Sequence, residues 1–207
     1  MYVSATLQRR MGFLLAVCAM MMLGGCGSSD EVMDPIPLPT LVDQGWSAFE
    51  SGNFAGAKSD FERAIADDPT NSAAHNGLGW ANMRLDDLQG AVTSFDAALT
   101  HGFSAADPHA GKAIVLRDLD PVDYAAAIAS ANTALGLESN YAFAHDAGLD
   151  WKDLRLILAQ SHFALGEYDE ANTQVGLLGG TAQDPALPTF VEDLLAEIAR
   201  LGQIIDV

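Results

Sequence analysis

The chain has 207 residues, of which 49% are hydrophobic, and its formal net charge is −18 at pH 7. A charge this negative repels phosphate groups, so it argues against nucleic acid and anionic lipid headgroups as binding partners. The length is sufficient for one domain of about 170 residues behind a short N-terminal segment.

Residues 1–25 have the composition of a secretory signal peptide. Arg9 and Arg10 give a positively charged start, and residues 11–23 form an apolar run. That run is shorter than the roughly 20 residues that a membrane-spanning helix needs. Because a signal of this kind is removed after export, we predict that residues 1–25 do not belong to the folded domain.

The end of this segment, Leu23-Gly24-Gly25-Cys26, resembles the lipobox of bacterial lipoproteins, which has a Leu, two small residues and a Cys. The resemblance implies a diacylglycerol on the Cys26 thiol, cleavage before Cys26 and acylation of the new amino group. Two or three acyl chains hold a protein stably at a membrane surface. The alternative is a plain signal peptide with cleavage nearby and a free thiol.

The residues around Cys26 indicate the membrane in which the protein is expected to be anchored. Gly27 replaces the Asp that marks inner-membrane retention in some bacteria, so the resemblance favours a lipid anchor in the outer membrane, facing the periplasm. Prolines at positions 35, 37 and 39 favour an extended tether over residues 26–39. The other cysteine of the chain, Cys18, lies in the apolar run. Removal of the signal peptide therefore leaves Cys26 without a second thiol for a disulfide.

Residues 41–99 contain one pattern of small and apolar residues twice, with a period of 34. In each copy the helical spacing of the apolar residues predicts two amphipathic helices, separated in the first copy by Ser51-Gly52-Asn53. A period near 34 is typical of stacked helix–turn–helix repeats. The identical pairs are Gly45 and Gly79, Trp46 and Trp80, Gly56 and Gly90, Ala57 and Ala91, Phe61 and Phe95, and Ala64 and Ala98.

The pattern resembles the tetratricopeptide repeat (TPR) over about residues 38–180. The first copy matches the family's characteristic positions with Gly45, Gly52, Phe54, Ala57, Phe61, Ala64 and Pro69. The second copy matches with Leu78, Gly79, Leu88, Ala91, Phe95 and Ala98 and lacks the closing proline. The resemblance implies an all-α fold, a TPR-type α-solenoid of about four helix–turn–helix repeats with a C-terminal capping helix.

The expected repeats lie over residues 38–71, 72–105, 106–139 and 152–184, within a domain of residues 40–207. In the third repeat, Pro121 suits the start of the second helix. Ala131 stands where the family has a large ring, so this layer is thin. Thr189 and Glu192 form a capping box that opens a last helix over residues 189–202, which covers the end of the solenoid.

Residues 136–152 depart from the repeat pattern. Tyr141, Phe143 and His145 alternate with alanines, which predicts a short extended segment. Two interpretations remain open from the sequence. The insertion is a feature specific to this protein, or its rings cover the thin third layer.

No constellation of catalytic residues stands out, so we predict a protein that is not an enzyme and that uses no cofactor and no metal. The glycine-rich residues 176–180 lack the Lys-Ser/Thr of a phosphate-binding loop. His75 and His109 occupy similar places in successive repeats, which would allow them to face each other, and we expect structural histidines there rather than a metal site. His145, Asp146 and Asp150 form only a weak candidate for a metal site.

The first helix of each TPR pair lines a concave face, so the resemblance implies a partner-binding groove there. Trp and Arg commonly dominate binding energy at protein interfaces. The alternative for the two tryptophans is a packing role in the core, and the sequence does not decide between the two. The predicted groove residues are Val42, Trp46, Phe49, Asn76, Trp80, Met83, Arg84 and Arg117.

These features lead to one functional expectation and two alternatives. We expect a membrane-anchored scaffold that binds another protein or peptide of the bacterial cell envelope. The first alternative is a structural subunit of a homo-oligomer that uses the thin third layer as its interface. The second is an enzyme with its site in the 136–152 insertion.

Overall fold

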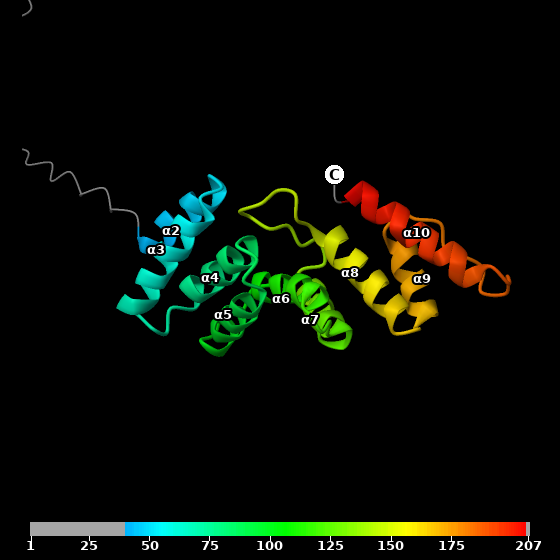
Figure 1. Cartoon of the computed structure of the whole chain (residues 1–207), viewed down its shortest axis with the longest axis horizontal. Coiled ribbons are helices and arrows are strands. Elements are labelled where there is room, and N and C mark those ends of the chain that lie inside the picture. Colours follow the sequence, from blue (N-terminus) through cyan, green and yellow to red (C-terminus); the bar gives the residue numbers. More distant parts are fainter. Residues whose placement is uncertain (1–39, 206–207) are drawn as a thin grey trace, which may run out of the picture. The chain divides into compact units, whose positions relative to one another are not determined.

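The computed structural model describes residues 40–205, and the predicted signal peptide, Cys26 and tether lie outside these described residues. Residues 40–205 form nine α-helices and one isolated antiparallel bridge, between Ala142 and Asp150 (Figure 1). The helices are α2 (Leu41–Glu50), α3 (Phe54–Asp67), α4 (Ser72–Arg84), α5 (Leu88–Thr100), α6 (Asp107–Asp118), α7 (Tyr124–Leu137), α8 (Trp151–Ala164), α9 (Tyr168–Leu177) and α10 (Phe190–Ile205). The all-helical prediction is confirmed for this part of the chain.

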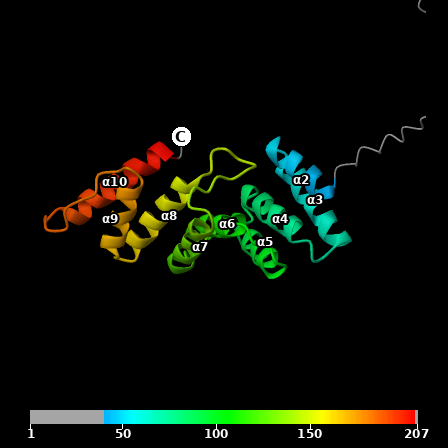
Figure 2. The same ribbon diagram turned by 180° about the vertical axis from the view of Figure 1, so that it is seen from behind.

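The helices pack as a row of helical hairpins. Each of the helices α2 to α9 contacts the next one in the chain, and the first helices of the pairs, α2, α4, α6 and α8, also contact one another in succession. The second helices of neighbouring pairs in residues 40–205 make no such contacts, which places the first helices on the inner side of the row. The connection between α7 and α8 lies on this inner side (Figures 1 and 2).

None of the helices in residues 40–205 is both long enough and apolar enough to span a bilayer.

The repeated glycines at positions 56 and 90 leave room for helix caps. The Asn53 side chain accepts the Gly56 N–H at 3.0 Å, and 34 residues later the Asp87 side chain accepts the Gly90 N–H at 3.0 Å. Each capping side chain lies where a Cβ atom of the glycine would stand. The glycine therefore keeps the cap in place, and the cap satisfies an N–H group that has no partner within the helix.

Two phenylalanine rings interlock neighbouring helix pairs. The Phe61 ring of α3 is fully buried and lies against Gly45 of α2 and Gly77 of α4. A Cβ atom at either glycine would overlap the ring, so each glycine is required by the close approach. The equivalent residues 34 positions later are Phe95, Gly79 and Gly111.

We expect Gly111→Ala to lower the free energy of unfolding by about 1–3 kcal/mol, because the added methyl group overlaps the buried Phe95 ring. Urea unfolding followed by circular dichroism measures this change. Gly136→Ala is the control without a loss, since nothing lies within 4 Å of a Cβ atom at that position. In the double variant with Phe95→Leu the overlap is smaller, so the two single losses will not add; full additivity would contradict the assigned contact.

The third helix pair begins its second helix later than predicted. Pro121 does not start the helix; α7 begins at Tyr124. The reason is the cap, because the Asp123 side chain accepts the Ala126 N–H at 3.0 Å and so fixes the first turn three residues further along the chain.

Residues 40–205 contain two apolar clusters that meet at α8. Leu154, Ile157 and Leu158 face the cluster shared by α2 to α7, whereas Leu156 and Ala159 face a second cluster formed with α9 and α10. The last helix, α10, packs on α8 and α9. It therefore covers the apolar surface that the last helix pair would otherwise expose to water.

Glu197 of α10 fixes the loop that precedes this helix. One carboxylate oxygen accepts the Thr181 N–H at 2.8 Å, and both oxygens pair with the guanidinium of Arg200 at 2.6 and 2.7 Å. The hydrogen bonds from Arg200 and Thr181 lower the pKa of Glu197 from 4.5 to about 2. The ionised form of Glu197 is therefore favoured by folding.

We expect Glu197→Gln to lower the free energy of unfolding at pH 7 by about 1–2 kcal/mol, because the carboxylate charge is lost and one of the two oxygens that accept from Arg200 is replaced by an NH2 donor. The pKa of Glu197 is lowered in the folded state, so its contribution is present above pH 4.5 and is lost as the pH falls towards 2. Urea midpoints of the wild type and the variant will therefore converge over that range. Glu192→Gln, at an exposed position of the same helix, is the control; a gap that stays constant with pH would contradict the prediction.

Candidate functional site

The inner faces of α2 and α4 present three aromatic rings. Trp46 and Phe49 come from α2, and Trp80 comes from the equivalent position of α4. Phe49 and Trp80 are buried, with 3% and 1% of their surface exposed, whereas Trp46 is half-buried. The centroids of Trp46 and Phe49 are 5.6 Å apart in an edge-on contact. We call these three side chains the ring surface.

The connection between α7 and α8 folds into a narrow hairpin over residues 141–151, the inner hairpin. The Phe143 N–H donates to the Leu149 carbonyl at 2.9 Å, and the Trp151 N–H donates to the Tyr141 carbonyl at 2.8 Å. Both bonds join the two arms of the hairpin to each other. The two arms of the hairpin are therefore tied to each other and to the start of α8.

The side chains of the first arm alternate between the two faces of the hairpin. Tyr141 and Phe143 are buried and His145 is half-buried, while the alanines at 142 and 144 are exposed. This alternation is the one that the sequence indicates for an extended segment. All three ring-bearing side chains consequently lie on the face that is turned towards the helices.

Phe143 of the inner hairpin contacts all three rings of the ring surface. Its ring stacks on Trp80 with centroids 3.9 Å apart and planes inclined by 23°. It also meets Trp46 and Phe49 edge-on, at centroid distances of 6.0 and 6.1 Å. Trp80 is thus enclosed between Phe143 on one side and Phe95 of α5 on the other, at 5.5 Å from the latter. Its burial in this structure is completed by the inner hairpin.

His145 covers the second tryptophan of the ring surface. Its ring stacks on Trp46 with centroids 3.7 Å apart and planes inclined by only 5°. Its Nδ1 lies 2.7 Å from a carboxylate oxygen of Glu50, at the end of α2. The histidine therefore combines an aromatic contact with a polar one, and both are directed to the first helix.

Arg84, at the end of α4, pairs with the tip of the inner hairpin. Its guanidinium lies 2.9 Å from the Asp146 carboxylate and 4.6 Å from the centroid of the Phe54 ring. The two charged side chains remain 41% and 37% exposed. An exposed pair of this kind contributes about 0–1 kcal/mol, so its main effect is to set the position of the hairpin along the helices.

An open pocket of 240 Å³ lies between the hairpin tip and the turn that follows α2. Its wall combines two phenylalanine rings and a glycine with a guanidinium, two carboxylates and a histidine ring. These groups suit a polar side chain that enters from the inner side of the row. The lining residues are Phe49, Glu50, Gly52, Phe54, Arg84, His145 and Asp146.

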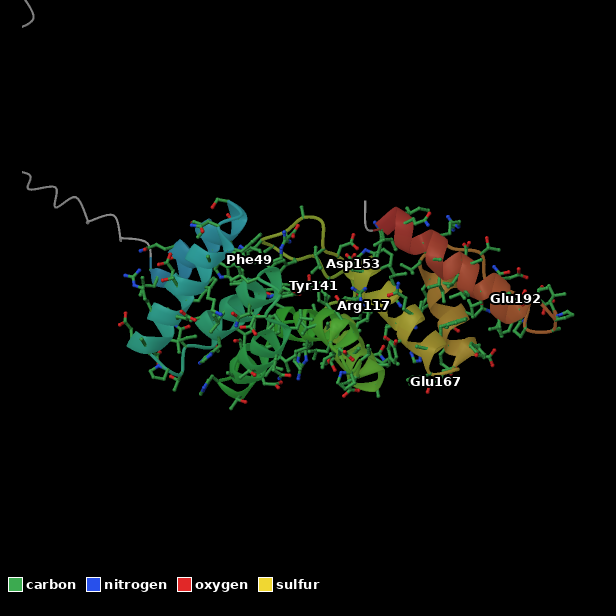
Figure 3. The ribbon with its side chains drawn as sticks, viewed as in Figure 1. Phe49, Arg117, Tyr141, Asp153, Glu167 and Glu192 are labelled. Carbon is green, nitrogen blue, oxygen red and sulfur yellow. The ribbon has the colours of Figure 1, made fainter. Side chains whose placement is uncertain are left out.

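Tyr141 connects the base of the inner hairpin to the third helix pair (Figure 3). It is fully buried near Asp107, in the first turn of α6. Burial raises the pKa of the Asp107 carboxyl, and burial together with the neighbouring Asp107 charge raises the pKa of the Tyr141 hydroxyl. The hairpin thus covers the third pair with Tyr141 and the first two pairs with Phe143 and His145.

The remaining predicted groove residues are distributed over the inner side. Val42 and Met83 are half-buried against the larger apolar cluster, and Asn76 is buried. Arg117 of α6 lies 3.4 Å from the side-chain oxygen of Gln160 in α8 (Figure 3). The structure therefore brings Trp46, Phe49, Trp80 and Arg84 together under one segment, whereas Arg117 serves the contact between α6 and α8.

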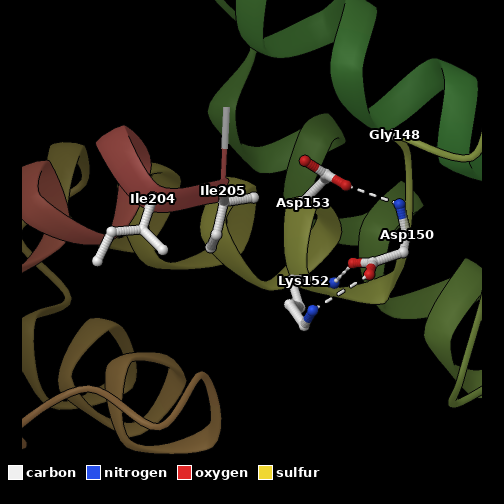
Figure 4. Close-up of a pocket in the computed structure, with 6 residues that line it drawn as sticks. All are labelled: Gly148, Asp150, Lys152, Asp153, Ile204 and Ile205. Atoms are coloured by element: carbon white, nitrogen blue, oxygen red, sulfur yellow. Dashed lines mark hydrogen bonds and ion pairs between the residues drawn. The ribbon is translucent and has the colours of Figure 1, made fainter. Parts of the chain in front are cut away.

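A second pocket, of 140 Å³, lies where the inner hairpin meets α8 and the end of α10 (Figure 4). Its carboxylates are used by the cap of α8. Asp150 accepts the Lys152 N–H at 2.7 Å, and Asp153 accepts the Asp150 N–H at 2.7 Å. Within residues 40–205 no group of three or more His, Cys, Asp and Glu side chains is arranged to hold a metal ion.

His75 meets His101 and not His109 in the structure. The His75 ring stacks on His101 with centroids 5.2 Å apart, and its Nε2 lies 3.0 Å from the Pro69 carbonyl oxygen. His101 directly follows α5, whose last residue is Thr100, whereas His109 lies in the first turn of α6. Burial, with the nearby Lys112 charge, lowers the pKa of His109.

Comparisons with known proteins agree with this architecture. A family model described as "Tetratricopeptide repeat" matches residues 42–110. No curated protein matches the sequence. Among solved structures, YrrB, described as a TPR protein with an unusual peptide-binding site, is 16% identical with a TM-score of 0.61, over 80% of this chain and 88% of that one.

Two further solved structures are similar at the same level. MamA is 20% identical with a TM-score of 0.57, over 80% of this chain and 87% of that chain. A thermophilic TPR protein of Thermus thermophilus, TTC0263, is 20% identical with a TM-score of 0.52, over 78% of this chain and 79% of that chain. The predicted TPR-type α-solenoid is thereby confirmed as the fold of this chain.

Proposed function

From this TPR-type fold, we propose that the protein is a membrane-anchored scaffold that binds another protein or peptide of the bacterial cell envelope. The observation that carries the proposal is the seating of an extended segment on the ring surface, where Phe143 stacks on Trp80 and His145 on Trp46. A surface that receives alternate side chains of one extended segment is suited to another. The described peptide-binding site of YrrB, a protein of similar fold, supports this use of the repeats.

The partner-binding part is tested by photocrosslinking in growing bacteria. A photoreactive phenylalanine derivative replaces Ser51, which is exposed in the turn after α2, beside the pocket at the hairpin tip. The same residue replaces Glu62, on the exposed face of α3, as the control. We expect one envelope protein to be crosslinked from position 51 and not from position 62. The absence of a crosslink from position 51, or the same crosslinks from both positions, would overturn the proposal.

The anchoring part rests on the lipobox-like residues 23–26, and the proposed location is the outer membrane, facing the periplasm. We expect the full-length protein to incorporate labelled palmitate and to partition into detergent. Cys26→Ala will lose both properties, because it removes the thiol that carries the lipid. Cys18→Ala, in the apolar run of the signal, is the matched control and will keep both. A Cys26→Ala protein that stays with the membrane would contradict the lipid anchor.

A further inference from the structure

We propose that the inner hairpin is a tethered occupant of the ring surface, and that a partner segment of the same chemistry displaces it. That segment is extended, carries ring side chains at two alternate positions, and has a carboxylate directly after the second ring. This inference rests on the proposed scaffold function. It adds to that function the class of partner and the means by which access to the surface is controlled.

The chemistry of the partner follows from the contacts that the hairpin makes. In an extended chain, alternate side chains lie on one face. Phe143 therefore reaches Trp80 while His145 reaches Trp46, and Asp146, the next residue, meets Arg84 at 2.9 Å.

The second ring position has an additional requirement. Glu50 lies 2.7 Å from Nδ1 of His145. A carboxylate at this distance favours a ring that carries an N–H donor, which His and Trp supply and Phe does not. The expected partner segment is therefore aromatic, any residue, His or Trp, then Asp or Glu.

The part of the inner hairpin beyond Tyr141 can leave the ring surface as a unit, while Tyr141 stays buried against the third helix pair. The backbone hydrogen bonds of the hairpin run between its own arms, as in the Phe143–Leu149 pair, and within residues 40–205 none joins its backbone to that of α2 or α4. Only side chains hold it on the ring surface. Its outer face carries small, exposed residues at 142, 144, 147 and 148, with nothing packed over them. Undocking from the ring surface therefore breaks no main-chain hydrogen bond to α2 or α4.

The two charge pairs at the tip also favour release. The Arg84 and Asp146 side chains are 41% and 37% exposed, and Glu50, the partner of the half-buried His145, is 53% exposed, so water replaces much of what these groups lose. Only molecules whose hairpin is undocked can bind a partner. The apparent affinity is therefore the intrinsic affinity multiplied by the fraction of undocked molecules. The hairpin thus weakens partner binding by competition, and a weakened hairpin strengthens it.

The test uses the hairpin's own sequence as the probe. A fluorescent peptide of residues 140–149, Asn-Tyr-Ala-Phe-Ala-His-Asp-Ala-Gly-Leu, is titrated with the full-length protein in detergent, and binding is followed by anisotropy. We expect the variant Phe143→Ser/His145→Ser to bind the peptide at least about tenfold more tightly than the wild type, because its hairpin no longer competes. A peptide with the same two serine substitutions is the control and will not bind.

A second variant keeps the test decisive if the double variant does not fold. Asp146→Arg places two positive charges together at an exposed site, so it loosens the hairpin without a change in the core. We expect it to raise the peptide affinity about threefold to tenfold. Asp169→Arg, an equal charge change at an exposed site of α9, will leave the affinity unchanged. No gain for Asp146→Arg in a folded protein would overturn the inference and make the hairpin a permanent part of the core.

The two proposals fail in different ways. A crosslinked envelope partner without any gain in peptide binding leaves the scaffold function standing and overturns the tethered-occupant inference. Tight peptide binding by the Asp146→Arg variant without an envelope partner supports the inference about the surface and overturns the scaffold function in the cell.

Discussion

Trp80→Ala is expected to lower the free energy of unfolding by about 3–5 kcal/mol, the range of large-to-small changes at a buried aromatic residue. Trp80 is 1% exposed and lies between Phe95 and Phe143, with centroid distances of 5.5 and 3.9 Å. Removal of the indole leaves a cavity that neither ring can fill without a shift of α5 or of the inner hairpin. Urea unfolding followed by far-UV circular dichroism measures the loss.

Trp46→Ala is the matched control, because Trp46 has the same residue type and the same place in its repeat, 34 residues earlier. Part of its indole is already in water, so the loss of stability will be smaller than for Trp80→Ala. Equal losses at the two positions would show that the difference in burial does not govern their stability. The comparison also shows which tryptophan is suitable for binding studies, since a variant that unfolds cannot report on a partner.

Leu194→Ala is expected to lower the free energy of unfolding by about 2–5 kcal/mol. Leu194 is 0% exposed and belongs to the second apolar cluster, with Leu156 of α8 and Val175 of α9. Because α10 contacts α8 and α9 and each repeat depends mainly on its neighbours, the loss will begin at the C-terminal end. Hydrogen exchange will show early opening of α9 and α10 in this variant.

Leu195→Ala is the control for the capping role of α10. The two leucines are adjacent in one helix, but Leu195 is 51% exposed. Its truncation is expected to change the free energy of unfolding by no more than about 0.5 kcal/mol. A comparable loss at both positions would contradict the side of α10 that is assigned to the cluster.

The fold follows from the 34-residue period because the period reports direct contacts between neighbouring helices. Phe61 and Phe95 recur since each fills the same space against glycines of two helices. Gly56 and Gly90 recur for a different reason, since each makes room for a capping side chain. The predicted start of α7 was wrong because the proline signal at Pro121 competed with a cap at Asp123, and the cap prevailed. Propensity alone does not rank two such signals.

Of the candidate site, the helix residues were predictable from the sequence, whereas the docking of the inner hairpin on them was not. The resemblance to the TPR implies that Trp46, Phe49, Trp80 and Arg84 line the inner side of the helix row, and in the structure the inner hairpin contacts all four. The alternation at 141–145 indicates an extended segment, yet nothing in it specifies where that segment docks. The pairing of His145 with Glu50 joins residues 95 positions apart and belongs to no period. Such a contact depends on the folded arrangement of the helices and cannot be read from a local sequence pattern.

The order in which the chain folds follows from these distant contacts. Repeat arrays assemble quickly because most of their contacts join neighbours in the chain. The inner hairpin instead ties His145 to Glu50 across 95 positions and Asp146 to Arg84 across 62. Closing loops this long costs conformational entropy, and this cost precedes any stabilisation by the contacts. We therefore expect the first two helix pairs to form before the inner hairpin docks, so that a partner segment of the proposed kind, if present during folding, meets an unoccupied ring surface.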